Sequence, residues 1–237
     1  MRTARRLAFG VAVVALLAAS AGAATIVQTK NYSGTPDFVQ GLTFNQFDDQ
    51  SGSLTLQSIK VEVMLNVSGG SLKTDNDGGQ SASGAVEFAA EILLSSPTVS
   101  LIDSSGQQIV QSGDVKAAGG TTISLTADDG DSEVGGTANF SYAGTDYGFY
   151  NGSSQSDGDL GYVGSFVFSQ YIGTGTYTVN VDADQVADYG ALGGVQAQID
   201  PLSASGSVTI TYTYVPEPAT IGLLALGGLA ILRRKRS

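Results

Sequence analysis

The sequence predicts an all-β fold, an antiparallel β-sandwich, on three observations. Apolar and polar residues alternate with a period of two over residues 54–67 and 208–214, as in strands with one buried face. Glycine supplies 32 of the 237 residues and proline only 5, which suits short strands joined by tight turns. Clusters of Gly, Asp, Asn and Ser separate the apolar segments. We expect one β-sandwich domain over residues 25–214, between two terminal segments of different character.

Shorter apolar runs between these two alternating segments predict the remaining elements. Strands are expected at residues 99–102, 109–111, 121–126, 137–142, 166–168 and 176–181. Residues 85–94 form either a short helix or a buried strand, because periodicity alone does not decide between the two. Residues 144–164 hold six glycines and few apolar side chains, so we expect loops there.

The composition excludes several classes of enzyme. The chain has no cysteine and no histidine. It therefore has no disulfide framework, no thiolate metal site and no cysteine nucleophile. The usual general base is also missing, so neither a Ser-His-Asp triad nor a His-ligated zinc can be built. We expect a protein that is not an enzyme and that has no catalytic cofactor.

The body of the chain is strongly acidic. Residues 25–215 contain four lysines and no arginine against 21 acidic residues, all but Glu217 of the chain's 22, which gives a net charge of −17. We expect such a body to repel nucleic acid and anionic membrane surfaces, because phosphate binding requires Lys or Arg. Divalent cations are the partners that this charge attracts.

Residues 1–24 have the three parts of a secretory signal peptide, which we expect to form a signal helix. Three arginines lie within the first six residues, an apolar run from Leu7 to Ala19 follows, and small residues end the segment at Ala23 and Ala24. We expect signal peptidase to cleave after Ala23 or Ala24. The alternative, a retained membrane anchor, is disfavoured because the apolar run is short for a membrane span.

Residues 215–237 form a second three-part segment. The segment runs from Pro216, Glu217 and Pro218 through an apolar and small stretch, Ala219 to Leu232, to the basic residues Arg233, Arg234, Lys235 and Arg236. As a single transmembrane helix, the fourteen residues of the stretch measure about 21 Å against a hydrocarbon core of about 30 Å. Such a helix spans the membrane only with snorkelling or local thinning. The basic cluster stays cytoplasmic by the positive-inside rule, so the body faces outward.

These three parts, in this order, resemble the PEP-CTERM sorting signal. The resemblance implies that Pro216, Glu217 and Pro218 are recognised by an exosortase, a membrane protease that cleaves near the motif. It also implies an exported precursor, anchored in the inner membrane, that passes to the cell surface or the extracellular matrix. The alternative is a plain tail anchor that is never cut.

Several segments of the body resemble the choice-of-anchor E domain, a family of exported domains that end in alternative sorting tails. They are residues 44–48 with 52–55, residues 171–176 and residues 208–214. The resemblance implies a β-sandwich at the cell surface, and it carries no catalytic residues.

Clustered carboxylates are the only chemistry that the body offers. Asp128, Asp129, Asp131 and Glu133 supply oxygen ligands for a structural calcium ion, which takes six to eight of them and can be held by acidic turns with glycine. None of the acidic clusters matches the twelve-residue EF-hand loop. The alternative is that the Asp-Gly pairs form hairpin turns and that their charge aids solubility.

Five aromatic rings near the glycine-rich region suggest a weak carbohydrate-binding face. They are Tyr142, Tyr147, Phe149, Tyr150 and Tyr162. The chain has no tryptophan, the usual sugar-stacking ring, and rings of this kind more often fill a core or brace a loop. We therefore interpret the chain as a structural or adhesive protein of a polysaccharide matrix or biofilm. A carbohydrate-binding module and a calcium-stabilised adhesion domain are the alternatives.

Overall fold

The computed structural model describes residues 22–130, 133–134, 137–138, 140–190, 192 and 194–217. Within these residues the chain forms antiparallel sheets and one 3₁₀ helix, η1 (Ser165–Gln170), so the predicted all-β fold is confirmed. The expected signal helix and transmembrane helix lie outside the described residues. Among the residues that are described, no helix is long and apolar enough to cross a membrane.

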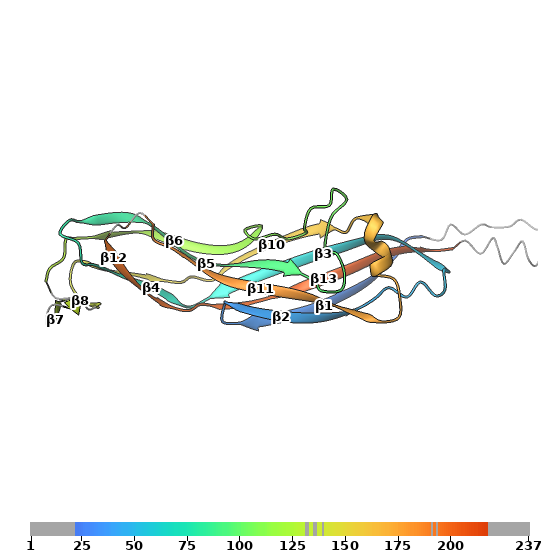
Figure 1. The fold of residues 1–237 in the computed structure, drawn as a ribbon, viewed down its shortest axis with the longest axis horizontal. Helices are drawn as coiled ribbons and strands as arrows, with labels where there is room; N and C mark the ends of the chain where they lie inside the picture. The colour runs from blue at the N-terminus through green and yellow to red at the C-terminus, as the bar shows by residue number, and fades with distance from the viewer. Residues whose placement is uncertain are drawn as a thin grey trace, which may run out of the picture.

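Two four-stranded sheets make up most of the molecule. The first has the order β1 (Ala24–Gly34), β13 (Ser203–Pro216), β3 (Leu54–Ser68), β10 (Gln155–Tyr162). The second has the order β2 (Phe38–Asn45), β11 (Thr176–Asp188), β5 (Ala82–Ser95), β6 (Val115–Leu125). The molecule is elongated, and β1 begins at the end where β13 finishes (Figure 1), because Ala24 pairs with Tyr214.

The main core lies between these two sheets. Alternation on β3 turns Ile59, Val61, Val63 and Leu65 inward, and each is at most 1% exposed. The inward residues of the neighbouring and facing strands complete the same cluster: Val208, Ile210 and Tyr212 on β13, Phe44 on β2, Tyr177, Val179 and Val181 on β11, and Ile92 and Leu94 on β5. Full burial of one such aliphatic side chain contributes about 1.5–3 kcal/mol. The period of two in the sequence is therefore the origin of the sandwich.

A third sheet lies at the end of the molecule remote from the termini (Figure 1). Its order is β12 (Val195–Asp200), β4 (Ser71–Asn76), β9 (Tyr147–Asn151), and the two-stranded pair β7 (Glu133–Val134) and β8 (Thr137–Ala138) lies near it. A smaller core supports this sheet, with Leu72, Val86, Ile123, Leu125 and Leu192 buried in it.

The third sheet begins where the β3–β13 ladder is interrupted. That ladder ends at the pair Ser68 and Ser203, and the β4–β12 ladder starts at Ser71 and Asp200. Between them Gly70 has φ +72°, and a β-carbon there would lie 2.8 Å from the Leu202 nitrogen. The bend between the two sheets therefore requires glycine at this position.

The structure decides one open alternative and corrects several expected elements. Residues 85–94, either a short helix or a buried strand by sequence, belong to strand β5. Residues 144–164 hold β9 and β10 rather than loops. Residues 166–168 lie in the helix η1. Of the expected strand at 137–142, β8 covers only Thr137 and Ala138.

No strand forms at residues 99–102 or 109–111, where Ile102 and Gln108 make an isolated bridge. The loop nevertheless packs against the main core, which buries Val99, Leu101, Ile109 and Val110 and partly buries Ile102. Val110 has φ +57°, which is incompatible with an extended ladder.

Candidate functional sites

The sorting motif begins inside the first sheet. Strand β13 runs through Pro216, which pairs with Leu54 of β3, and the Glu217 amide donates a hydrogen bond of 2.9 Å to the Ser53 carbonyl. Proline is tolerated here because it stands at the end of a strand, where a missing N–H costs least. The sandwich therefore passes into the motif without a linker, and Pro218 lies just outside the described residues.

A tight turn before β3 supplies the carbonyl that holds Glu217. The side chains of Asp48 and Asp49 accept hydrogen bonds from the amides of Gln50 and Ser51, at 2.9 and 3.1 Å. Such short-range carboxylate bonds are typical of Asp in turns. The turn is thus built by its own residues and does not depend on the tail.

The expected signal cleavage site lies at the same end of the molecule. Ala23 is exposed, and Ala24 starts β1 opposite Tyr214, two residues before Pro216. The two processing signals are therefore neighbours in space although they are about 190 residues apart in the chain. The expected anchor, Ala219 to Leu232, and the basic residues Arg233 to Arg236 lie outside the described residues.

The structure brings three carboxylates together at the opposite end. Ligand oxygens of Asp128, Asp129 and Asp146 all lie within 4.8 Å of one another. The sequence predicts Asp128 and Asp129 as cation ligands but gives no signal for Asp146, which lies seventeen residues beyond Asp129. Of the other two expected ligands, Asp131 lies outside the described residues, and only the backbone of Glu133 is described.

Local hydrogen bonds fix two of these carboxylates. Asp128 accepts a bond of 2.8 Å from the Gly130 amide, which forms an Asx turn, and Asp146 Oδ2 accepts one of 3.0 Å from the Asp129 amide. Asp146 is fully buried, and its Oδ1 atom has no hydrogen-bond partner. A buried carboxylate oxygen without a partner is costly unless a cation or a donor compensates it.

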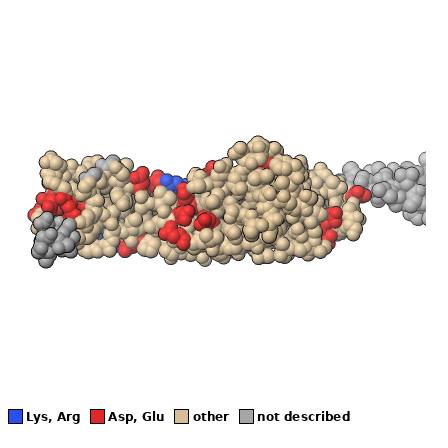
Figure 2. Space-filling view, in the orientation of Figure 1, with Lys and Arg blue, Asp and Glu red and all other residues tan. Residues whose placement is uncertain are grey.

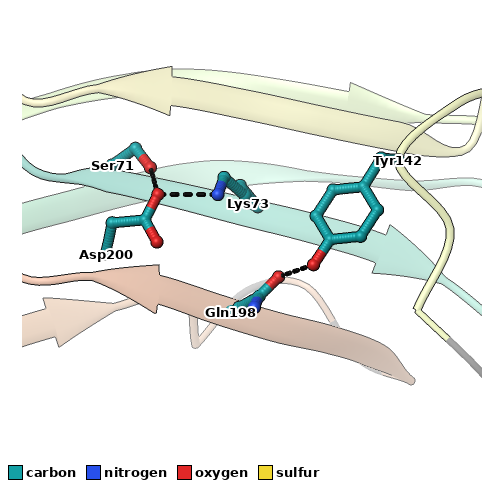
Figure 3. A network of polar contacts seen from close by, with 5 residues as sticks. All are labelled: Ser71, Lys73, Tyr142, Gln198 and Asp200. Carbon is teal, nitrogen blue, oxygen red and sulfur yellow. Dashed lines mark hydrogen bonds and ion pairs between the residues drawn. The ribbon is translucent and has the colours of Figure 1, made fainter.

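A polar network crosses the outer face of the third sheet (Figure 3). Asp200 of β12 accepts hydrogen bonds from Ser71 at 2.7 Å and from Lys73 at 2.6 Å, and Tyr142 donates to Gln198. The hydrogen bond to Asp200 raises the pKa of Lys73, and the bonds from Lys73 and Ser71 lower the pKa of Asp200. The Lys73 ammonium also lies 5.7 Å from the centroid of the Tyr142 ring, within the range of a cation–π contact.

The five aromatic residues suggested as a carbohydrate-binding face do not share one surface. Tyr142 and Phe149 are 57% and 46% exposed and lie beside the polar network, since Phe149 pairs with Lys73 across β4 and β9. Tyr147 contacts Tyr142 at 6.3 Å between ring centroids. Tyr150 packs against both cores, and Tyr162 ends β10 in another sheet. Tyr142, Tyr147 and Phe149 therefore lie together at the third sheet, and whether they bind carbohydrate stays a prediction.

Comparison with known families identifies a PEP-CTERM protein-sorting motif at residues 215–236. The motif supports an exported protein that is sorted by an exosortase, and it matches the three-part tail found in the sequence. No curated protein matches the chain. The resemblance of the body to the choice-of-anchor E domain stays a prediction.

Solved structures show only weak likeness. A structure of the infectious bursal disease virus Gx strain is 13% identical and aligns over 91% of this chain and 43% of that chain, with a TM-score of 0.20. The VP2 subviral particle of the same virus is 9% identical and aligns over 92% of this chain and 50% of that chain, with a TM-score of 0.15. The chain spans half or less of the length of these proteins, and TM-scores this low do not establish a shared fold.

Proposed function

We propose that this chain is a structural or adhesive protein of the cell surface or extracellular matrix, delivered there by an exosortase, and that it is not an enzyme. The observation that carries the proposal is the junction of β13 with the sorting motif, where Pro216 and Glu217 still belong to the sheet. The sandwich thus holds the first residues of the motif in place, whereas a flexible linker at this point would uncouple the sandwich from the motif. The lack of histidine and cysteine supports a role without catalysis.

The orientation of the molecule supports the same role. The start of β1 and the end of β13 lie at one end of an elongated body, and the third sheet lies at the other (Figure 1). The carboxylate cluster belongs to the segments between β6 and β7 and directly before β9. In the membrane-anchored precursor the third sheet therefore projects away from the bilayer. Any contact with matrix polymer is expected there.

The decisive experiment reads the mature C-terminus by mass spectrometry in a host that has an exosortase. We expect the protein to end near Pro218, and a plain tail anchor predicts an intact Ser237 on surface-localised protein. Exchange of Pro216, Glu217 and Pro218 for Ala should leave export intact and trap the chain in the membrane. Glu217→Ala alone is the matched variant, because the backbone bond from residue 217 to Ser53 persists. Release of Glu217→Ala at the wild-type rate would exclude recognition of this carboxylate.

The exposed rings of the third sheet favour carbohydrate binding as a second candidate function. Tyr142 and Phe149 offer apolar ring surface next to the Lys73, Gln198 and Asp200 side chains, a combination of stacking and hydrogen-bonding groups that suits a sugar chain.

Binding to purified matrix polysaccharide tests this candidate. Retention should fall in Tyr142→Ala and Phe149→Ala, and it should stay unchanged in Phe166→Ala, because Phe166 is equally exposed at 61% but lies in η1, outside the third sheet. Equal retention of all three variants would contradict a binding face here.

A further inference from the structure

We propose that Asp128, Asp129 and Asp146 bind one calcium ion near the end of the sandwich remote from the chain termini. Acidic side chains gather at that end of the face shown in Figure 2, beside β7 and β8. The three carboxylates come from two segments, one between β6 and β7 and one directly before β9. An ion between them ties these two segments together.

The burial of Asp146 is the first argument for a bound cation. Its side chain is fully buried, and its Oδ1 atom lacks a hydrogen-bond donor, while Oδ2 accepts from the Asp129 amide. A folded protein compensates such an atom with a cation, a donor or a proton. The ligand oxygens of two further carboxylates lie within 4.8 Å of a ligand oxygen of Asp146, and the repulsion among three such groups favours the binding of a cation between them.

No lysine or arginine of the described residues supplies that counter-charge. Lys60, Lys73 and Lys116 form ion pairs with Glu62, Asp200 and Glu87. The fourth lysine of the body, Lys30, lies on β1 opposite Val208, in the first sheet. Among the described residues, therefore, no basic side chain compensates the buried Asp146 carboxylate, and a bound cation supplies that charge.

Gly144 makes the convergence of the oxygens possible. A β-carbon at this position would lie 2.6 Å from Asp129 Oδ2 and 2.6 Å from Asp146 Oδ1, so both atoms point into the space beside the glycine. Gly144 also has φ +98°, which side-chain-bearing residues rarely adopt. The backbone is thus shaped to leave room where the two carboxylates meet.

The donor set selects calcium among the divalent ions. All available ligands are hard oxygens, and the chain has no histidine or cysteine for zinc or copper. Magnesium demands a near-ideal octahedron of short bonds, whereas calcium accepts six to eight oxygens in irregular loops. Extracellular calcium modules of this kind have dissociation constants of about 0.1–1 mM, which suits an exported protein.

Thermal unfolding of the full chain in detergent, first with EDTA and then with CaCl₂ or MgCl₂ up to 10 mM, tests the site. At 10 mM, a tenfold to hundredfold excess over such dissociation constants, we expect calcium to raise the melting temperature by about 3–10 °C and magnesium to raise it much less. Absence of a calcium shift above about 1 °C in the wild type, or an equal shift with magnesium, would overturn the proposal.

Three variants separate a metal site from general charge screening. Asp146→Asn should abolish the rise in melting temperature that calcium causes. In EDTA this variant should melt no lower than wild type in EDTA, because the amide replaces a buried charged group. Asp128→Asn should weaken calcium affinity by at least about tenfold in calorimetric titration. Asp159→Asn is the control, because that carboxylate is exposed on β10, and it should respond as wild type does. A full calcium response in Asp146→Asn would overturn the proposal.

Discussion

Exchange of two buried tyrosines for phenylalanine should reveal a directional hydrogen-bond chain in the main core. The hydroxyl groups of Tyr177 and Tyr212 lie 2.8 Å apart, and Tyr212 donates to the Asn45 carbonyl at 3.1 Å. Because Tyr212 donates its hydroxyl proton to the Asn45 carbonyl, the Tyr177 hydroxyl must donate the hydrogen bond between the two hydroxyl groups. The chain therefore runs from β11 through β13 to β2 and connects both sheets.

The direction of this chain makes the two single variants unequal. Tyr177→Phe removes one donor and leaves Tyr212 bound to Asn45, so it should cost about 1 kcal/mol of unfolding free energy. Tyr212→Phe leaves the Tyr177 hydroxyl buried without its acceptor, which adds about 1–3 kcal/mol. The Asn45 carbonyl is spared in both cases, since the Gln28 amide still donates to it at 2.9 Å. Tyr212→Phe should thus cost about 2–4 kcal/mol.

Urea unfolding of the two single variants and the double variant measures these quantities. The double variant lacks the Tyr177 hydroxyl that is left without an acceptor in Tyr212→Phe, so it should be at least as stable as Tyr212→Phe alone. This gives a coupling free energy of about 1–3 kcal/mol. Additive single effects, or a larger loss in Tyr177→Phe than in Tyr212→Phe, would refute the assigned direction. An unchanged m-value is the control that both variants unfold from the same native state.

Two further predictions follow from the core. Burial raises the pKa of four tyrosines, Tyr32, Tyr171, Tyr177 and Tyr212, and raises that of Tyr212 to about 12. Above about pH 10 the folded chain therefore keeps protons that the unfolded chain releases. Stability should therefore be flat below about pH 10 and fall above it by up to about 1.4 kcal/mol per pH unit for each tyrosine; a flat urea midpoint from pH 8 to 11.5 would contradict this. Gly206→Ala should cost at least about 2 kcal/mol, because its β-carbon would meet the Met64 carbonyl at 1.9 Å, whereas Gly79→Ala, with open space around it, should match wild type in urea unfolding.

The sequence predicts the central strands well and the edge strands poorly. β3 and the end of β13 show their period of two because one face of each packs into the core while the other is polar. β1 and β10 lie at the edges of the first sheet and expose most of their side chains on both faces, so they leave no alternation to detect. Residues 144–164 have six glycines and few apolar side chains, which predicts loops, although β9 and β10 form there.

A buried apolar segment can also predict a strand where none forms. Val99, Leu101 and Ile109 are buried, yet they belong to a loop that packs on the core through side chains and makes only an isolated bridge. The apolar run indicates burial correctly, but its backbone partners are set by the tertiary fold. The prediction was thus right about the environment and wrong about the element.

One candidate site can be predicted from the sequence in full and the other only in part. The tail is recognisable in sequence because its three parts are contiguous, and the motif at residues 215–236 bears this out. The carboxylate cluster is only half visible, since Asp146 joins Asp128 and Asp129 through the fold that brings the start of β9 beside the end of β6. The Thr126 amide donates a hydrogen bond of 3.1 Å to the Thr145 carbonyl and so helps to hold the two segments side by side.

In the proposed membrane-anchored precursor, the length of the sandwich keeps most of the acidic body away from the lipid surface. The fifteen residues of β3 alone span about 50 Å at about 3.4 Å per residue, and the third sheet extends the body further. The Debye length at physiological ionic strength is about 8 Å, so charges near the far end lie several screening lengths from the bilayer. Repulsion from the lipid surface therefore acts only on the end near β1 and the motif. In the proposed arrangement the carboxylate cluster is then free to concentrate divalent cations from the matrix, because the membrane neither competes for them nor repels the cluster.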